Sequence, residues 1–312
     1  MMIAVLLLAH AVVLAAAGRW WLPGASWPLR APRLGIAVWQ VLTAGVVAST
    51  VLAGLVLAIP GVRVGGNAGG LLGACMMAVR ARYSTPGGAA AGVAGGALAL
   101  AVLGRLAWCA GSAAAGGRRR RARHDDALTL LARPGPAPGI LLLDHDQPAA
   151  YCLPGRRRVV LTTGALRCLD GRQLDAVLAH ERAHLAARHH LVLAFAAALQ
   201  AALPFRLFGD AAEQIACLVE MAADAAAARR AHRLVLAGAL LALSAARIPA
   251  GALGAGGSAT GQRVRRLIEP SGQSSRVRRA VASSAMLIAV PVLAFSAPAA
   301  AVLSMTGCPV GA

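Results

Sequence analysis

Residues 177–184 read VLAHERAH, and this stretch decides how the chain folds and what it can do. His180 and His184 are four residues apart, so on a helix they lie one turn apart on the same face. That spacing lets both imidazoles reach one zinc ion, and Glu181 then lies beside the metal, able to take a proton from a bound water. The apolar residues around the motif predict a half-buried helix, in which a glutamate between two histidines would be costly without a metal.

The composition indicates a membrane protein. The chain has 312 residues, of which 58% are hydrophobic and 14% charged, and its mean hydropathy is +0.65. Soluble domains carry roughly 25% charged residues. The formal net charge is +19, with arginine as the only basic residue besides histidine, which excludes chemistry that depends on lysine. The arginines cluster beside apolar blocks, which favours contact with anionic lipid over direct binding of nucleic acid.

Four apolar blocks predict four membrane spans, at residues 1–17, 36–59, 87–104 and 280–303. Five arginines in the six positions 118–123 follow the third block, and this run predicts that the region after it is cytoplasmic. We therefore expect a three-span membrane region at 1–117, a catalytic domain at 118–250, a flexible basic linker at 251–279, and a fourth span with a short outer tail at 280–312. The expected location is the cell membrane, with several spans and a cytoplasmic catalytic domain.

The region before the histidine motif predicts a small α+β unit. The short apolar run 140–143 and the β-branched run 158–163 are typical of strands. Asp170 and Gln173 form a capping-box pair, so a helix is expected to begin at Gly171 and to continue through His184. The fold class predicted is mostly α, with multi-span membrane helices and a cytoplasmic zincin-like α+β metallopeptidase domain.

A catalytic zinc needs a third protein ligand from another element. Glu220 and Asp224 are four residues apart in an alanine-rich segment with strong helix propensity. One carboxylate can bind the metal while the other holds a histidine N–H. The alternative is a solvated acidic face paired with Arg229 or Arg230.

Other segments leave alternatives open. The apolar run 191–205 is short for a span, and a single crossing there would separate Glu220 from His180, so we expect it to be buried, re-entrant or paired with another crossing. His189 and His190 are expected at the membrane surface rather than in the site. Gly88, Gly92 and Gly96 recur every fourth residue, which either favours close helix packing or reflects compositional bias.

The chain resembles the BlaR/MecR-type membrane zinc metallopeptidases and, more distantly, the HtpX-type membrane proteases. The resemblance rests on four stretches between about residues 139 and 230: 150–155, 159–162, 174–190 with the HExxH motif, and 220–224. It implies that His180, His184 and Glu220 bind Zn²⁺, that Glu181 is the catalytic base, and that Asp224 supports the ligands. The chain departs from the BlaR/MecR pattern after residue 303, where only a short tail follows, so β-lactam sensing is not expected.

The expected function is that of a membrane-anchored zinc-dependent endopeptidase, in which Glu181 activates a zinc-bound water. The BlaR/MecR resemblance implies signal transduction by regulated proteolysis of a cytosolic partner, such as a BlaI-like transcriptional repressor. The alternatives are an HtpX-like protease for membrane protein quality control and a non-enzymatic, arginine-rich membrane scaffold. The strand at 158–163 is expected to pair with an extended substrate, and no side chain is assigned to substrate binding.

Overall fold

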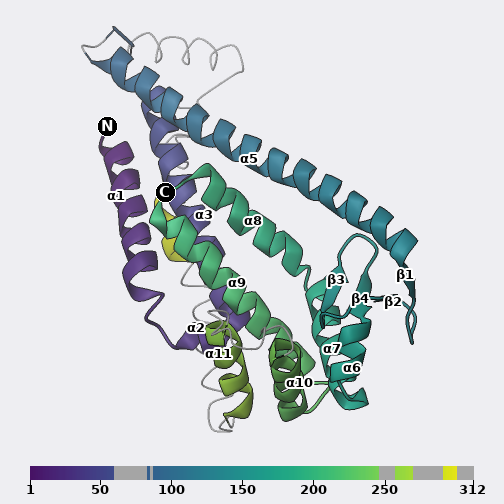
Figure 1. Ribbon diagram of the computed structural model, residues 1–312. Helices are drawn as coiled ribbons and strands as arrows, with labels where there is room; N and C mark the ends of the chain where they lie inside the picture. The colour runs from purple at the N-terminus through teal and green to yellow at the C-terminus, as the bar shows by residue number, and fades with distance from the viewer. Residues whose placement is uncertain (60–82, 85–86, 246–256, 270–290, 301–312) are drawn as a thin grey trace, which may run out of the picture.

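The computed structural model describes residues 1–59, 83–84, 87–245, 257–269 and 291–300, and these residues form a mostly helical protein with one small sheet (Figure 1). The N-terminal helices are α1 (Met2–Ala16), which continues into a π-helical turn (Ala17–Trp21), α2 (Trp27–Arg30), α3 (Pro32–Ala58) and α5 (Gly88–Leu131). Further helices are α6 (Thr163–Cys168), α7 (Gly171–Ala186), α8 (His189–Ala202), α9 (Arg206–Ala227), α10 (Arg233–Ala245), α11 (Gly257–Ile268) and a short apolar helix at Pro291–Ala300.

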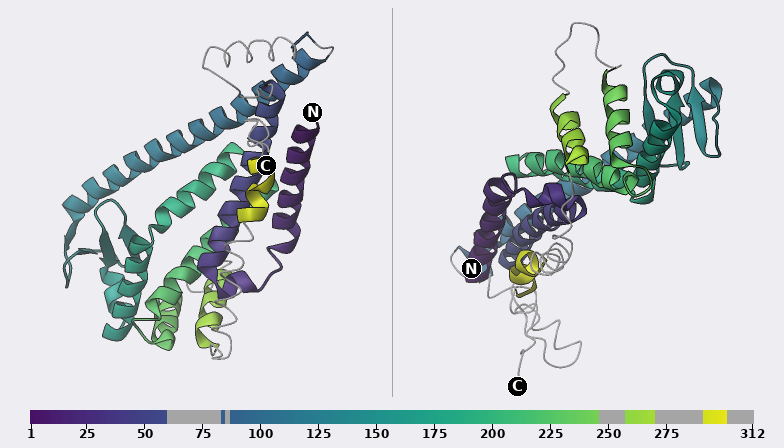
Figure 2. Two further views of the ribbon diagram at one scale, coloured as in Figure 1. Left: turned by 180° about the vertical axis from the view of Figure 1, so that it is seen from behind. Right: turned by 90° about the horizontal axis from the view of Figure 1, so that it is seen from below.

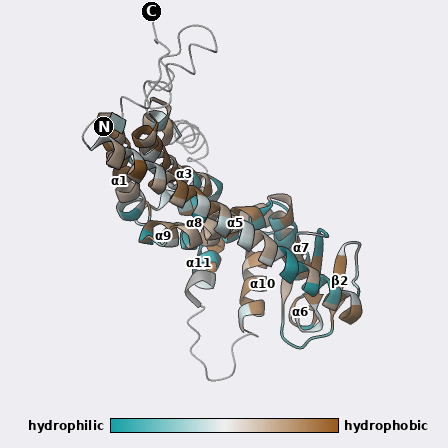
Figure 3. Ribbon diagram, turned by 90° about the horizontal axis from the view of Figure 1, so that it is seen from above, coloured by the Kyte–Doolittle hydropathy of each residue, from teal (hydrophilic) through white to brown (hydrophobic). Residues whose placement is uncertain are grey.

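Three helices of the described residues are long and apolar enough to cross a membrane: Met2–Trp21, α3 and α5. They include the three predicted N-terminal spans, and seen from above α1 and α3 carry mostly hydrophobic residues (Figure 3). Trp20 and Trp21 are exposed at the end of the first helix, as expected for aromatic side chains at a membrane interface. Which side of the membrane each end faces stays a prediction.

The arginine run lies inside α5. The third span was predicted at 87–104 with a basic flank after it, but the helix continues without a break through residues 118–123 to Leu131, over 44 residues in all. Alanine and arginine are both strong helix formers. The arginine run therefore ends the apolar stretch but not the helix. As a result α5 runs from the membrane region to the sheet, where β1 (Ala132–Pro134) follows it directly (Figure 1).

Close contact between α3 and α5 depends on two glycines. A methyl group added at Gly54 would lie 2.5 Å from the carbonyl oxygen of Gly95, so neither position has room for a larger side chain. Of the three glycines singled out from the sequence, Gly92 packs against Tyr83, whereas a methyl at Gly96 would make only ordinary contact. The tight approach of α3 thus involves Gly95, which is not one of the three glycines singled out from the sequence, while Gly92 does make a close contact.

The sheet has four strands in the order β1-β2-β4-β3. The strands β2 (Ile140–Leu143) and β4 (Arg158–Thr162) match the two predicted runs and pair in parallel, while β3 (Ala150–Leu153) pairs with β4 antiparallel. β4 is therefore an inner strand, bonded on both sides. The prediction that this strand pairs with a substrate is wrong, and β3 is the edge strand beside α7.

Helices α7 and α8 are joined at a bend of 59°, and α8 packs between α5 and α9 (Figures 1 and 2). Together they also have the length and composition of one broken span or a re-entrant segment. We treat α7 as part of the sheet-bearing domain because Leu178 packs against the strand residues Ile140 and Leu161. α8 buries Ala196 and Leu199 but exposes Leu191 and Phe195, so only one of its faces is covered by protein.

The predicted flexible linker contains a helix. Within 251–279, the twelve residues of α11 form a helix that buries Val264 and Leu267 against α10, because apolar residues at helical spacing outweigh the glycines before them. Residues 251–256 and 270–279 of that range lie outside the described residues. So do 280–290 and 301–303 of the predicted fourth span, whose middle is a ten-residue apolar helix at Pro291–Ala300. Nε2 of His10 in α1 donates a hydrogen bond to the Leu293 carbonyl of that helix, at 2.7 Å.

Candidate metal centre

The helix that carries the histidine motif is fixed at its start and along its inner face. Asp170 caps it by accepting a hydrogen bond from the Gln173 backbone at 2.8 Å, and the Gln173 side chain accepts one from the Asp170 backbone at 3.0 Å. This capping box confirms the predicted start of α7. Val177 and Leu178 are buried against α6, α10 and the sheet, so the next turn presents His180 and Glu181 toward α9.

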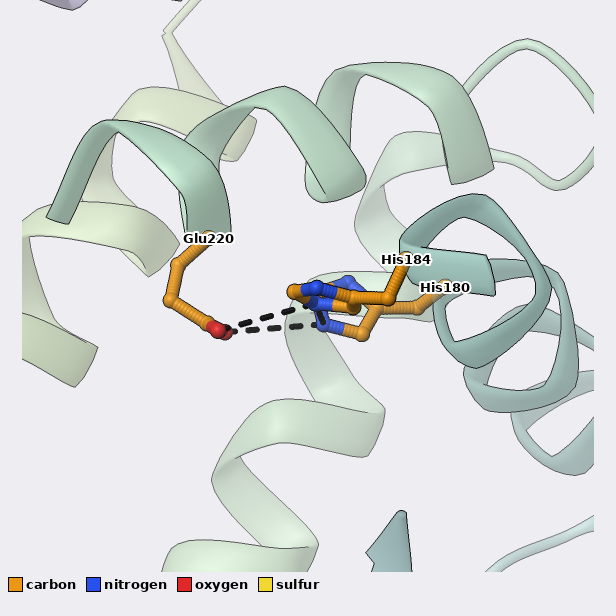
Figure 4. A group of neighbouring side chains, drawn as sticks. All are labelled: His180, His184 and Glu220. Atoms are coloured by element: carbon orange, nitrogen blue, oxygen red, sulfur yellow. Dashed lines mark hydrogen bonds and ion pairs between the residues drawn. The ribbon is translucent and has the colours of Figure 1, made fainter. Parts of the chain in front are cut away.

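Three potential metal ligands converge from two helices. His180 and His184 of α7 point toward Glu220 of α9 (Figure 4), and one ligand atom from each lies within 4.8 Å of the others. The two Nε2 atoms are 3.0 Å apart, and each lies 3.5 Å from an oxygen of the Glu220 carboxylate. The structure thus brings together the three residues proposed from the sequence as ligands.

These separations fit a small tetrahedral ion. Bonds of about 2.0–2.1 Å hold the ligand atoms of a tetrahedral zinc about 3.3 Å apart. The two Nε2 atoms are 3.0 Å apart, and each lies 3.5 Å from a different oxygen of Glu220, so all three distances are close to that value. Two imidazoles and one carboxylate also form the ligand set of catalytic zinc sites that leave one position free.

Asp224 lies behind His180. Its Oδ1 atom is 3.0 Å from Nδ1 of the ring, close enough for an ion pair although the ring N–H is not aligned for a regular hydrogen bond. Asp224 is only 1% exposed, so its carboxylate has no access to bulk water. The carboxylate therefore holds the imidazole from the side opposite to Glu220, as expected for a residue that supports a metal ligand.

Arg263 is a site residue that the sequence interpretation missed. Its Nε and Nη2 atoms each donate to Asp224 at 2.8 Å, and its Nη1 lies 3.0 Å from Glu220. The sequence had suggested Arg229 or Arg230 as alternative partners of these carboxylates, but neither contacts them. The sequence prediction does not include Arg263 because α11 lies within the predicted linker 251–279. The sequence signal for this helix is the helical spacing of Val264 and Leu267.

His189 also contacts the site. It is buried, and its Nδ1 lies 3.0 Å from Nδ1 of His184. The expectation that His189 lies outside the site is therefore wrong, while its position relative to the membrane surface stays a prediction. Arg188 adopts a left-handed conformation with φ of 52°, which ends α7 and begins α8, and this turn brings His189 back under His184.

The pKa values of the two histidine rings are shifted in opposite directions. Burial lowers the pKa of His184, and the nearby His180 lowers it further, so its ring is neutral and ready to bind a cation. Burial also acts to lower the pKa of His180, but the bonds to Asp224 and Glu220 outweigh it and raise the pKa to about 9. A metal ion must therefore displace a proton from His180.

Glu181 lies in the same cavity but outside the group of ligands. Burial raises its pKa to about 7, and the neighbouring Glu220 raises it as well, while His180 opposes the shift. Cys152 of β3 lines the same cavity, and burial raises the pKa of its thiol to about 12, so the thiol beside Glu181 is protonated at neutral pH. Glu181 is thus a carboxylate poised between its two protonation states near neutral pH.

Comparison with known proteins agrees with this geometry. The model of peptidase family M48 matches residues 117–254, which include the sheet, α7, α9 and α10. A "Protease HtpX homolog" of Aquifex aeolicus (strain VF5) is 41% identical over 73 residues, which are 22% of this chain and 24% of that protein. Another from Polynucleobacter necessarius subsp. necessarius (strain STIR1) is 38% identical over 71 residues, or 22% and 25% of the two chains. No solved structure matches the chain.

The matched region is therefore about a quarter of the length of these curated relatives. Both relatives have the HtpX name, so the comparisons support the HtpX side of the resemblance and not the BlaR/MecR side. M48 peptidases are metallopeptidases, and the described residues include a His, His and Glu group able to hold a metal ion. The comparisons and the geometry together support an HtpX-like zincin domain within residues 117–254.

Proposed function

We propose that this chain is a membrane-anchored, zinc-dependent endopeptidase of the HtpX type. The observation that carries the proposal is the convergence of His180, His184 and Glu220 beside the buried Glu181. When bound, the zinc ion would polarise the scissile carbonyl and acidify a water molecule. His180, His184 and Glu220 would hold the ion, and Asp224 would orient His180.

Glu181 would act as the general base and then as the general acid. A carboxylate with a pKa of about 7 can accept a proton from the attacking water at neutral pH and return it to the leaving amine. Cys152 lines the cavity beside this carboxylate with its thiol protonated. Arg263 would keep Glu220 and Asp224 ionised, because its guanidinium contacts both carboxylates.

The substrate is proposed to be an extended polypeptide. A cavity of about 740 Å³ contains the site and is lined on one side by β3 and on the other by the α10 residues Leu236, Leu240 and Leu243. β3 pairs with β4 on one edge, so the other edge can accept a substrate strand. The leucines favour apolar side chains, as found in unfolded or misassembled membrane proteins, and this favours a quality-control role.

The replacement Glu181→Gln tests the proposal. We expect a loss of cleavage of at least about 100-fold in proteoliposomes, with zinc content unchanged, because the amide cannot transfer the proton. The control is Glu213→Gln, which makes the same change on the exposed surface of α9. Cleavage that persists in Glu181→Gln with zinc retained would show that Glu181 is not the base.

The choice of substrate separates the two protease hypotheses. An unfolded protein such as casein and a BlaI-like repressor are offered to the same wild-type preparation. Degradation of the unfolded protein at many bonds supports the quality-control role, whereas a single cut in the folded repressor would support the regulatory role predicted from the BlaR/MecR resemblance. The scaffold hypothesis predicts neither cleavage nor any effect of a chelator.

A further inference from the structure

A second cavity lies on the other side of α7 and is strongly basic. It has a volume of about 870 Å³ and is bordered by the start of α3, the turn between β3 and β4, α7, and the end of α9. Five arginines line it: Arg33, Arg157, Arg182, Arg229 and Arg230. We call this cavity the arginine basin. No aspartate or glutamate is among its lining residues.

The five arginines have no carboxylate partner within the described part of the chain. The ion pairs formed there by arginine involve Arg19, Arg156, Arg167, Arg263 and Arg265. Arg229 donates one hydrogen bond to the carbonyl of Ala225, its own helical neighbour. All five side chains are exposed, so together they give the basin a positive potential that would attract an anion from solution.

The dipole of α9 explains the positions of only two of the five arginines. Arg229 and Arg230 follow the C-terminus of α9, where a cation is favoured in any helix. Arg33, Arg157 and Arg182 come from three other elements and have no such reason to gather here. Arg157 moreover adopts a left-handed backbone conformation, with φ of 52°, which is uncommon for a residue other than glycine.

The basin also lies beside a candidate membrane span. Arg33 is in the first turn of α3, and Ile36, one turn further along that helix, forms part of the basin wall together with Val192 of α8. The cavity thus combines a basic rim with apolar side chains that continue into the apolar helices. Arginine pairs with phosphate oxygens in a two-pronged geometry, and a phospholipid supplies both the phosphate and the apolar chain.

We propose that the arginine basin binds the phosphate of an anionic phospholipid at the membrane surface. The bound lipid would connect α3 to α7 and α9, the two helices that carry the metal ligands. The basin uses Ala179 and Ala183 of α7, and the proposed metal ligands are not among its lining residues, although His189 lines the basin and contacts His184. The proposal concerns lipid binding, so it and the proposed protease activity can each fail without the other.

The test uses the full chain purified in detergent. Native mass spectrometry measures the binding of phosphatidylglycerol and of phosphatidylcholine to the wild type and to two variants with matched charge. The basin variant combines Arg157→Gln, Arg229→Gln and Arg230→Gln. The control combines Arg133→Gln, Arg167→Gln and Arg172→Gln, three exposed arginines of β1, α6 and α7 that lie outside the basin and outside the candidate membrane spans.

We expect the wild type and the control to bind phosphatidylglycerol in preference to phosphatidylcholine. The basin variant should bind phosphatidylglycerol about 100-fold more weakly, at about fivefold for each arginine. Competition by inorganic phosphate would support recognition of the phosphate group. Equal binding of the two lipids, equal loss in both variants, or stabilisation by inorganic phosphate without phosphatidylglycerol binding would overturn the proposal.

Discussion

The carboxylate of Asp224 lies 3.0 Å from Nδ1 of His180, on the edge of the ring that faces away from Glu220. The contact fixes which nitrogen of His180 is available to a metal ion. Because Asp224 is 1% exposed and is also held by Arg263, it is unable to turn away from the ring.

Replacing Asp224 with asparagine should therefore weaken zinc binding. We expect a loss of affinity of about 10- to 100-fold, the usual effect of removing a residue that supports a metal-bound histidine. The measurement is competition for zinc with a chelator of known affinity. Asp210→Asn serves as the control, because Asp210 lies on the same helix but pairs with Arg19 instead. Equal affinities for the two variants would argue against a role for Asp224 in the metal site.

Replacing Arg263 with alanine should destabilise the fold. Asp224 and Glu220 would lose their shared cation inside the protein, which costs about 3–5 kcal/mol of the free energy of unfolding when a buried pair is broken. Arg265→Ala should cost less than about 1 kcal/mol, because Arg265 on the same helix pairs with Glu269 at the surface. Chemical denaturation in detergent, followed by tryptophan fluorescence, compares the two. Similar losses would mean that the contacts of Arg263 contribute no more than a surface pair.

Zinc binding should release a proton at neutral pH. The pKa of His180 is raised to about 9 without metal, so the ring is protonated at pH 7 and must become neutral to bind. Zinc affinity is therefore expected to increase as the pH rises toward 9 and then to level off. Calorimetric titration of the metal-free protein in buffers of different ionisation enthalpy counts the protons released. Binding at pH 7 without proton release would contradict the raised pKa of His180 and its protonated state in the metal-free protein.

The sequence predicted the parts of the site that depend on spacing along one element. His180 and His184 share a helical face, Asp170 and Gln173 mark the start of that helix, and Glu220 and Asp224 are four residues apart on α9. Each of these relationships follows from the geometry of a single helix. The contact between α7 and α9 could also be predicted, because a catalytic zinc needs a third protein ligand from another element.

Contacts between distant elements could not be predicted in this way. Arg263 reaches Glu220 only because α11 packs on α9 and α10, and the glycine-rich residues before α11 hid that helix. His189 reaches His184 because the chain turns sharply at Arg188. The order of the strands likewise depends on pairing, which is why the inner strand β4 was mistaken for an edge.

The most direct test of the central claim is the metal content of the purified chain. We expect one zinc ion per chain in the wild type and in Glu213→Gln, and a large loss of zinc in Glu220→Gln, because Glu220 lies 3.5 Å from both histidine Nε2 atoms whereas Glu213 is exposed. X-ray absorption should show two imidazoles and a carboxylate around the ion. A wild-type protein that binds no stoichiometric zinc, or a Glu220→Gln variant that binds it as tightly, would contradict the account.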